Sequence, residues 1–206
     1  MDNANFYDNR YLSENNFKKD FNFYKLFIKF LQKRYSLQPL EKGKNAIDLG
    51  CGTGAVLTHF EGLGFSNIYG CDYSNVAIKK LKDKFTNVFV QDICSPINLD
   101  VSFDLITAFE VFEHLEEPEK AISNIKKILK KDGLLVFTTP FPNTSSHFTD
   151  ISIKYSDEWS AILDSLNMTV ASYPVKFVSL LWRFGLPLIE VRPENSTTVI
   201  YVAKIK

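Results

Sequence analysis

Apolar residues in the first part of the chain recur at helical spacing. Between residues 17 and 35 they stand three, four or seven positions apart, and lysines occupy many of the positions between them. This spacing predicts an amphipathic helix that packs at the edge of a sheet or also covers a ligand site. The predicted apolar face consists of Phe17, Phe21, Tyr24, Ile28, Leu31 and Tyr35.

The rest of the chain alternates between short apolar runs and longer amphipathic stretches. Short apolar runs bounded by glycine, proline or acidic residues are typical of buried strands, and strands that alternate with helices favour a parallel α/β sheet with right-handed crossovers. We predict helices from about 53 to 61, 74 to 85, 118 to 131 and 156 to 165, and strands over 46–49, 67–72, 88–92, 103–109, 134–139, 168–173 and 197–204.

Composition narrows the class of protein. The chain has 206 residues, of which 45% are hydrophobic and 23% charged, and this suits one α/β domain with a sizeable core. We predict a single domain over residues 1–206, with 1–40 as an N-terminal helical cap. The formal net charge is zero, which argues against a nucleic acid backbone as the main partner.

Targeting signals are not apparent in the sequence. The first residues show no basic stretch followed by an apolar one, so no signal peptide is indicated. The most apolar stretch, Val175–Val191, is interrupted by Lys176 and Arg183, which makes it unsuitable as a membrane span. Three cysteines without paired-ligand spacing fit a reducing compartment. We therefore expect a cytoplasmic protein with no membrane partner.

The most informative stretch is residues 45–54, which read Asn-Ala-Ile-Asp-Leu-Gly-Cys-Gly-Thr-Gly. It predicts a buried strand that enters a glycine-rich turn and then a helix. Glycines permit unusual backbone angles, and they let a ligand lie against the N–H groups that open the helix. The stretch also satisfies the loose G-x-G-x-x-(G/A) pattern of NAD-binding folds, so the glycines alone leave two ligand classes open.

Asp48 separates these two ligand classes. It lies within the predicted strand, two positions before the first glycine, where a buried carboxylate is costly unless something pairs with it. A dinucleotide does not need an acid there, because its pyrophosphate is already negative. A ligand that carries an ammonium group can pair with the acid, so Asp48 favours such a ligand.

With Asp48, the turn resembles the first motif, (D/E)-x-G-x-G-x-G, of the class I S-adenosylmethionine (SAM) dependent methyltransferases. Asp48, Gly50, Gly52 and Gly54 match its fixed positions. The resemblance implies an α/β, doubly wound, Rossmann-like fold, with a seven-stranded, mostly parallel sheet, helices on both faces and an antiparallel last strand. Within the class, the chain is similar to small-molecule methyltransferases of the ubiquinone-biosynthesis type.

Acidic residues end the next two predicted strands. Asp72 ends the second strand, beside the crevice where doubly wound sheets bind ligands, and can accept both hydroxyls of a ribose. A helix-capping aspartate is the alternative, weakened because Ser74 is available as the cap. The resemblance places Asp92 on the adenine amino group, with a plain turn aspartate as the alternative. The remaining expected cofactor contacts are Cys51 in the turn, Tyr73 along the adenine, the Ile93 backbone N–H on the ring, and Phe109 at the methionine part.

Methyl transfer from a sulfonium is an in-line displacement, so the enzyme mainly has to align acceptor, methyl group and sulfur. An oxygen or nitrogen acceptor also has to lose a proton. His114 follows the fourth predicted strand on the ligand side and is the candidate catalytic base, with a structural hydrogen-bonding role as the alternative. His59 lies within a predicted helix and is expected to be structural, and His147 lies in the loop after the fifth strand.

Glu110, Glu113 and His114 form a second candidate set. Their spacing allows all three to share one helical face, and two carboxylates with an imidazole can hold a divalent metal. The pattern resembles the metal ligands of quinone-ring O-methyltransferases and of enzymes that methylate the terminal ribose of small RNAs. Glu-His is also common here in methyltransferases without metals, so we assign no metal ligand and keep a divalent metal as an open alternative.

The sequence thus predicts an enzyme that transfers a methyl group from SAM to an oxygen or nitrogen of a small-molecule acceptor, with S-adenosylhomocysteine as the product. A metal-assisted RNA ribose methyltransferase, a SAM-binding protein without catalysis and a nicotinamide oxidoreductase are the alternatives. The acceptor and the oligomeric state are not readable from the sequence. Residues that form either an acceptor pocket for an anionic group or a plain packed helix are Phe177, Trp182, Arg183, Phe184 and Arg192.

Overall fold

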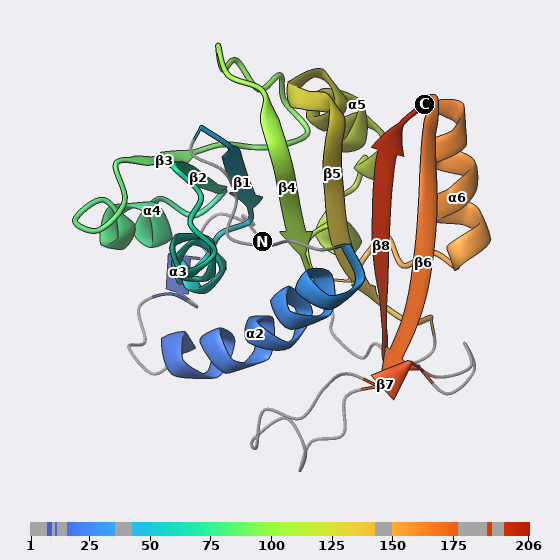
Figure 1. Ribbon diagram of the computed structural model, residues 1–206, viewed down its shortest axis with the longest axis horizontal. Coiled ribbons are helices and arrows are strands. Elements are labelled where there is room, and N and C mark those ends of the chain that lie inside the picture. The colour runs from blue at the N-terminus through green and yellow to red at the C-terminus, as the bar shows by residue number, and fades with distance from the viewer. Residues whose placement is uncertain are drawn as a thin grey trace. The chain divides into compact units, whose positions relative to one another are not determined.

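The protein divides into two compact units (Figure 1). The first consists of Met1–Asp92 and Val178–Leu188, and the second of Ile93–Phe177 and Ile189–Lys206. The computed structural model describes residues 8–9, 11, 16–35, 43–142, 150–176, 189–190 and 196–206, and the side chains of all of these except 16–20 and 189–190. The prediction of a single domain with a cap over residues 1–40 stays a prediction.

Three parallel strands form the centre of the first unit. They are β1 (Asn45–Leu49), β2 (Asn67–Asp72) and β3 (Asn87–Val90), and β2 lies between the other two. Helix α3 (Ala55–Gly62) connects β1 to β2, and α4 (Asn75–Leu81) connects β2 to β3. The three strands predicted from the apolar runs are confirmed, with ends within two residues of the prediction.

Helix α2 (Asn16–Tyr35) confirms the predicted N-terminal helix and packs against α3. Its buried positions are Leu26, Phe27, Ile28 and Leu31, whereas Tyr24 and Tyr35 of the predicted face are half-buried. The buried face is therefore rotated relative to the predicted one. Aromatic packing explains part of the rotation, because the Phe27 ring meets the Phe23 ring edge-on at 5.3 Å.

The described residues of the second unit form five strands. β4 (Phe103–Phe109) pairs in parallel with β5 (Leu129–Pro140), and β5 pairs antiparallel with β8 (Thr198–Ile205). β8 also pairs antiparallel with β6 (Met168–Lys176), whose end pairs with the two-residue β7 (Ile189–Glu190). The antiparallel last strand is confirmed, and the described residues contain one strand, β7, beyond the seven predicted.

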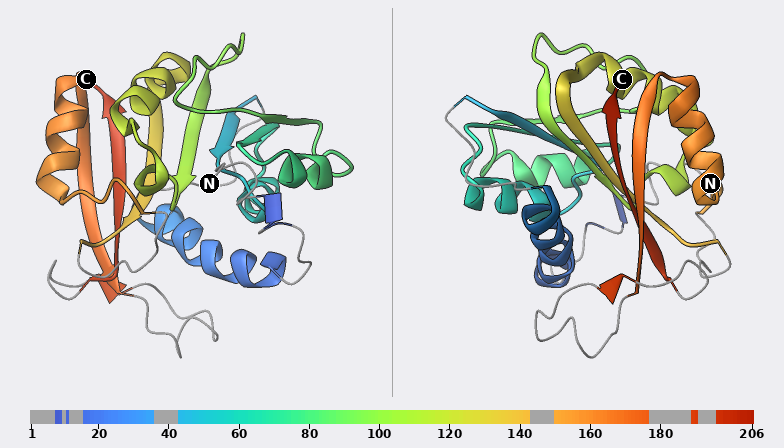
Figure 2. Two further views of the ribbon diagram at one scale, coloured as in Figure 1. Left: turned by 180° about the vertical axis from the view of Figure 1, so that it is seen from behind. Right: turned by 45° about the vertical axis from the view of Figure 1, so that its right-hand side comes forward.

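Two helices and a short 3₁₀ turn complete the second unit. The turn η1 (Phe112–His114) and helix α5 (Pro118–Ile128) follow β4, and helix α6 (Ser156–Ser165) packs along β6 (Figure 2). No helix among the described residues is long and apolar enough to cross a membrane.

An aromatic cluster holds η1 against the strands of the second unit. Phe112 is fully buried, and its ring lies 4.8 Å from the Phe137 ring of β5 and 5.9 Å from Trp159 of α6. Phe137 in turn stacks on Tyr201 of β8 at 4.7 Å. Because large aromatic side chains bury much apolar area, Phe112 anchors the turn that carries Glu113 and His114.

Three local predictions need correction. The helix predicted to end near Lys131 ends at Ile128, and β5 begins at Leu129 rather than 134. The Asp132-Gly133 pair is not a separate turn but lies in an irregularity of β5, where the register with β4 shifts. Ser156, predicted as the cap of α6, is the first residue of that helix, and its hydroxyl pairs with that of Tyr201 at 3.1 Å.

Candidate functional site

Three left-handed glycines wind the turn that follows β1. Gly50, Gly52 and Gly54 have φ angles of 71°, 48° and 76°, a region that costs residues with a Cβ about 1–2 kcal/mol. The N–H groups of Gly50 and Cys51 donate to the Cys71 carbonyl at 2.8 and 2.9 Å, and that of Gly54 donates to the Cys51 carbonyl. These three N–H groups are therefore bonded within the turn itself, and the contact of a ligand with the N–H groups that open α3 stays a prediction.

Asp72 ties the glycine turn to the end of β2. Its carboxylate is buried, and its two oxygens accept hydrogen bonds from Gly52 N–H and Ser74 N–H, both at 2.8 Å. Ser74 is the cap of α4, and its hydroxyl accepts from Ala77 N–H at 3.1 Å, as predicted. Asp72 therefore holds two peptide groups at the carboxyl end of β2, and its contact with a ribose stays a prediction.

Asp48 is a buried carboxylate on β1, with 3% of its surface exposed. The charge on Asp48 acts on two buried thiols, those of Cys51 and Cys71. Burial, and after it the charge on Asp48, raises the pKa of Cys51 well above its usual value. Burial, followed by the charges of Asp72 and Asp48, raises the pKa of Cys71 in the same way. The first unit therefore concentrates negative charge beside the glycine turn, which suits a cationic ligand group.

The remaining predicted cofactor residues differ in exposure. Tyr73 is 46% exposed after β2, and Asp92 is exposed after β3. In the second unit, Ile93 is 6% exposed and Phe109, the last residue of β4, is 4% exposed. Exposed Tyr73 and Asp92 side chains are accessible to a ligand, whereas Ile93 is placed to offer its backbone. All four assignments stay predictions.

Tyr11 lies against the glycine turn of the first unit. A Cβ added at Gly52 would stand 2.8 Å from the Tyr11 hydroxyl oxygen. The Tyr11 carbonyl accepts a hydrogen bond from Lys80 Nζ at 2.7 Å, and Asp8 accepts one from Val76 N–H at 3.2 Å. These contacts fasten Asp8 and Tyr11 to α4, and the covering of a ligand site by the N-terminal cap stays a prediction.

His59 is structural, as expected. Its Nε2 lies 3.0 Å from the Phe21 carbonyl oxygen, and its ring stacks on the Phe21 ring at 4.1 Å. Burial lowers the pKa of His59, which keeps the ring neutral and joins α3 to α2.

In the second unit, two carboxyl groups lie together after β4. Burial raises the pKa of Glu110 to about 7, while the Thr138 hydroxyl donates to its Oε1 at 2.8 Å. Burial, and then the charge on Glu110, raises the pKa of Glu113 well above its usual value. The Oε2 of Glu113 is buried without a hydrogen-bond partner among the described residues. The pair therefore holds at least one proton at neutral pH.

The prediction that Glu110, Glu113 and His114 share one helical face is wrong. Glu110 has a left-handed φ of 55°, and the only helical turn here is η1, which begins at Phe112. The left-handed residue breaks the helical spacing between Glu110 and the other two. Within the described residues, no group of three or more His, Cys, Asp and Glu side chains is arranged to hold a metal ion.

His114 pairs with Asp150. Its Nδ1 lies 3.2 Å from Asp150 Oδ1, and the two side chains are 18% and 7% exposed. The segment after Asp150 is held in place because Ile151 and Ser152 donate their N–H groups to the Glu113 carbonyl at 2.8 and 2.9 Å. A carboxylate on Nδ1 orients an imidazole and leaves Nε2 as the proton acceptor. This geometry suits a general base.

Several predicted residues lie outside the described part of the chain. They are His147 and the candidate acceptor residues Phe177, Trp182, Arg183, Phe184 and Arg192.

Sequence reasoning missed three polar residues that organise the second unit. Asp150 follows the fifth predicted strand, and no pattern in the sequence pairs it with His114. Thr138 lies within the mostly apolar sequence of β5, which gives no separate signal for it. Asn124 offered a clearer signal, because it interrupts the apolar face of α5 that Ala121, Ile125 and Ile128 form.

Comparisons with known proteins agree with this geometry. The family described as "Methyltransferase domain" matches residues 18–191. The ribosomal protein L11 methyltransferase of Thermosipho africanus is 31% identical over 146 residues, which are 68% of this chain and 53% of that protein. The ubiquinone biosynthesis O-methyltransferase of Glaesserella parasuis is 33% identical over 108 residues, 47% of this chain and 45% of that protein. The chain thus spans about half the length of these curated relatives.

Solved structures agree on the fold. A SAM-dependent methyltransferase from Clostridium acetobutylicum superposes with a TM-score of 0.66 at 17% identity, and the match covers 98% of this chain and 97% of the other. Such a likeness shows the doubly wound, Rossmann-like α/β fold that the resemblance of the glycine turn implied. The chain therefore belongs to the methyltransferase-domain family and has the fold of SAM-dependent methyltransferases.

Proposed function

We propose that this chain transfers a methyl group from SAM to an oxygen or nitrogen of a small-molecule acceptor by in-line displacement. The observation that carries the proposal is the pair formed by His114 and Asp150, whose side chains meet at 3.2 Å. When bound, SAM supplies an electrophilic methyl group on a sulfonium sulfur. The protein's own contribution is to hold the cofactor, orient the acceptor and remove its proton.

The first unit has the features that suit the cofactor. Gly52 brings the turn close to Tyr11, because a Cβ there would lie only 2.8 Å from the Tyr11 hydroxyl oxygen. Asp48 supplies a buried carboxylate for the ammonium group, and Asp72 supplies one for the ribose hydroxyls. The exposed Asp92 is then available for the adenine amino group.

The second unit has the features that suit proton removal. Asp150 accepts the Nδ1 proton of neutral His114, so the Nε2 lone pair can take the proton of the acceptor's hydroxyl or amine. The imidazolium that forms is then stabilised by the Asp150 carboxylate. His114 is the catalytic residue in this proposal, and Asp150 positions it.

Cofactor binding is tested with two ligands, one with and one without the amino-acid tail of the cofactor. S-Adenosylhomocysteine carries the amino-acid tail, and 5′-methylthioadenosine lacks it. In calorimetric titrations, we expect Asp48→Asn to weaken the binding of S-adenosylhomocysteine by about tenfold, or about 1.4 kcal/mol. The affinity for 5′-methylthioadenosine should not change. Asp72→Asn is expected to weaken both. If the folded wild-type protein binds neither compound, the proposal fails, and NADH is the next ligand to titrate.

The catalytic base is tested by transfer of radiolabelled methyl groups from SAM to a panel of phenols, catechols and primary amines. We expect His114→Gln to lower kcat by about 10²–10⁴-fold, the usual contribution of a general base. Asp150→Asn should lower kcat by a smaller factor and move the pH dependence of kcat, with the KM for SAM unchanged. An unchanged kcat in both variants would contradict the assignment of His114.

The names of the relatives point to different acceptors, a ribosomal protein for one and a ubiquinone precursor for the other. The formal net charge of zero supports the small molecule. The same labelling assay with total ribosomal protein distinguishes the two acceptor classes. If ribosomal protein is labelled and none of the small molecules is, a protein acceptor replaces this proposal. A cytoplasmic location stays a prediction.

A further inference from the structure

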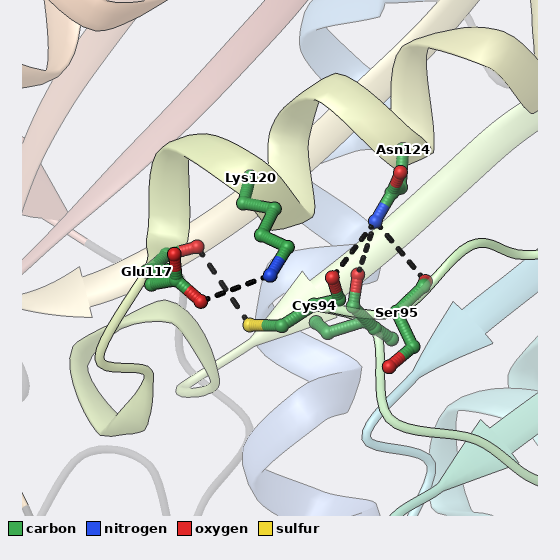
Figure 3. A network of polar contacts seen from close by, with 6 residues as sticks. Cys94, Ser95, Glu117, Lys120 and Asn124 are labelled. Carbon is green, nitrogen blue, oxygen red and sulfur yellow. Dashed lines mark hydrogen bonds and ion pairs between the residues drawn. The ribbon is translucent and has the colours of Figure 1, made fainter.

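Asn124 fixes the loop that follows β3. It lies on α5 with 6% of its surface exposed, and its Nδ2 donates to the carbonyl oxygens of Ile93, Cys94 and Ser95 at 3.3, 3.1 and 3.0 Å (Figure 3). Since carbonyl oxygens can only accept, the amide nitrogen has to be the atom that faces the loop. One side chain thus holds three successive peptide groups.

A second contact ties the same loop to α5. The Cys94 thiol lies 3.7 Å from the Glu117 carbonyl oxygen at the start of the helix, while Lys120 bonds the Glu117 carboxylate at 3.1 Å (Figure 3). The loop is therefore fastened by its backbone to Asn124 and by the Cys94 side chain to Glu117. Hydrophobic packing alone would not require a buried amide here, because the neighbouring positions of this helix face are apolar.

The three hydrogen bonds determine which way the loop presents its N–H groups. In a planar trans peptide, the C=O and the following N–H point in opposite directions. Carbonyls of Ile93 and Cys94 that point at Asn124 therefore turn the N–H groups of Cys94 and Ser95 away from α5. The Ile93 carbonyl is one of the bonded groups, so Asn124 also holds in place the residue whose own N–H is the expected adenine contact.

The geometry points to Asn124 as the residue that sets the enzyme's selectivity for adenine, acting through the loop of residues 93–95. This inference rests on the proposed function, in which Asp92 and the Ile93 N–H meet the adenine edge. Adenine offers an amino group and a ring nitrogen acceptor on that edge, and hypoxanthine offers a carbonyl and a ring N–H instead. A fixed loop rejects hypoxanthine, because its polar groups would face unpaired partners, whereas a loose loop adapts to both.

The test compares S-adenosylhomocysteine with S-inosylhomocysteine, which differs only in the base. The variant is Asn124→Asp, which keeps the side-chain shape but replaces the donor with an oxygen that repels the three carbonyls. We expect wild type to prefer the adenine compound at least tenfold, and the variant to prefer it less than threefold, mainly through weaker binding of that compound. Lowering the pH from 8 to 5.5 should restore part of the preference, because a protonated carboxyl regains one O–H donor.

Lys127→Ala is the matched control. Its Nζ lies 3.4 Å from Asn124 Oδ1 on the opposite side of the amide, so removing it leaves the three loop bonds intact and should keep the wild-type preference. If Asn124→Asp weakens both compounds equally and keeps the preference, Asn124 is merely structural and the inference is overturned.

The outcomes separate this inference from the proposed function. If the wild-type protein binds neither compound, both the proposed function and this inference are overturned. If the wild type and Asn124→Asp prefer the adenine compound by the same factor, only the role of Asn124 is overturned. If Asn124→Asp does not fold, Asn124→Ser replaces it. That variant keeps a single uncharged donor, and an intermediate preference supports the inference while an unchanged one overturns it.

Discussion

At the scale of single residues, the buried carboxyl pair after β4 makes stability depend on pH. Burial raises the pKa of Glu110 from 4.5 to about 7, and burial followed by the charge on Glu110 raises the pKa of Glu113 well above its usual value. The folded protein therefore keeps protons that the unfolded chain has released above about pH 4.5. Because the folded state binds more protons in this range, the free energy of unfolding falls as pH rises through 7.

Glu113→Gln should remove part of this loss of stability at high pH. The amide keeps the shape and still donates to Glu110, but it has no proton to lose. We expect the variant to gain stability over wild type by about 1–3 kcal/mol at pH 8, since each unit of pKa shift is worth about 1.4 kcal/mol, and by less at pH 5. Thermal unfolding at both pH values measures this, with exposed Glu116→Gln as the control. A gain that is the same at pH 5 and pH 8 would contradict the raised pKa.

At the scale of elements, the start of β5 depends on a glycine without a side chain. A Cβ at Gly133 would stand 2.8 Å from the Phe103 carbonyl oxygen and 3.0 Å from that of Lys130. These are backbone atoms that cannot rotate away. This close approach lets β5 run beside β4 where the register between the two strands shifts.

Gly133→Ala should therefore destabilise the protein by about 1–3 kcal/mol, the usual cost of overpacking. The matched control is Gly62→Ala at the end of α3, where an added Cβ would meet nothing within 4 Å. That change is expected to be neutral or to stabilise by up to about 1 kcal/mol, because alanine is the better helix former. Urea denaturation of the two variants gives the comparison, and equal effects would argue against the close approach.

At the scale of the whole molecule, the three thiols report on the two units separately. Cys51 and Cys71 are buried in the first unit with their pKa values raised by burial, whereas Cys94 in the second unit is half-buried. Only thiolates react readily. The two buried thiols can therefore react only when the first unit opens.

We expect Ellman's reagent at pH 8 to modify Cys94 first and the other two in a much slower phase. Subdenaturing urea should speed the slow phase, and S-adenosylhomocysteine at 100 times its Kd should slow it by up to about 100-fold, or 2.7 kcal/mol. Cys94→Ala should abolish the fast phase alone. Fast modification of all three thiols would show that the first unit is not closed around Cys51 and Cys71.

Most of the strand–helix order could be predicted from the sequence, because each element is encoded by nearby residues. The period of apolar residues locates β1, β2, β4 and α6 to within a residue, and the end of a parallel strand is the place to look for Asp48 and Asp72. Predictions that assumed ideal local geometry fared worse. The helical face of Glu110, Glu113 and His114 failed because one left-handed residue breaks the spacing.

By itself, the sequence determined the α/β fold class, the glycine turn and the acids at the strand ends, since spacing along the chain is enough to specify them. Only the tertiary structure decided which groups those residues meet. Asp150 meets His114, Thr138 meets Glu110, and Tyr11 lies on Gly52, while Asn124 gathers three carbonyls of a distant loop. The physical reason is that hydrogen bonds and pKa shifts depend on distance in space and on burial, and residues far apart in the sequence acquire both only when the chain has folded.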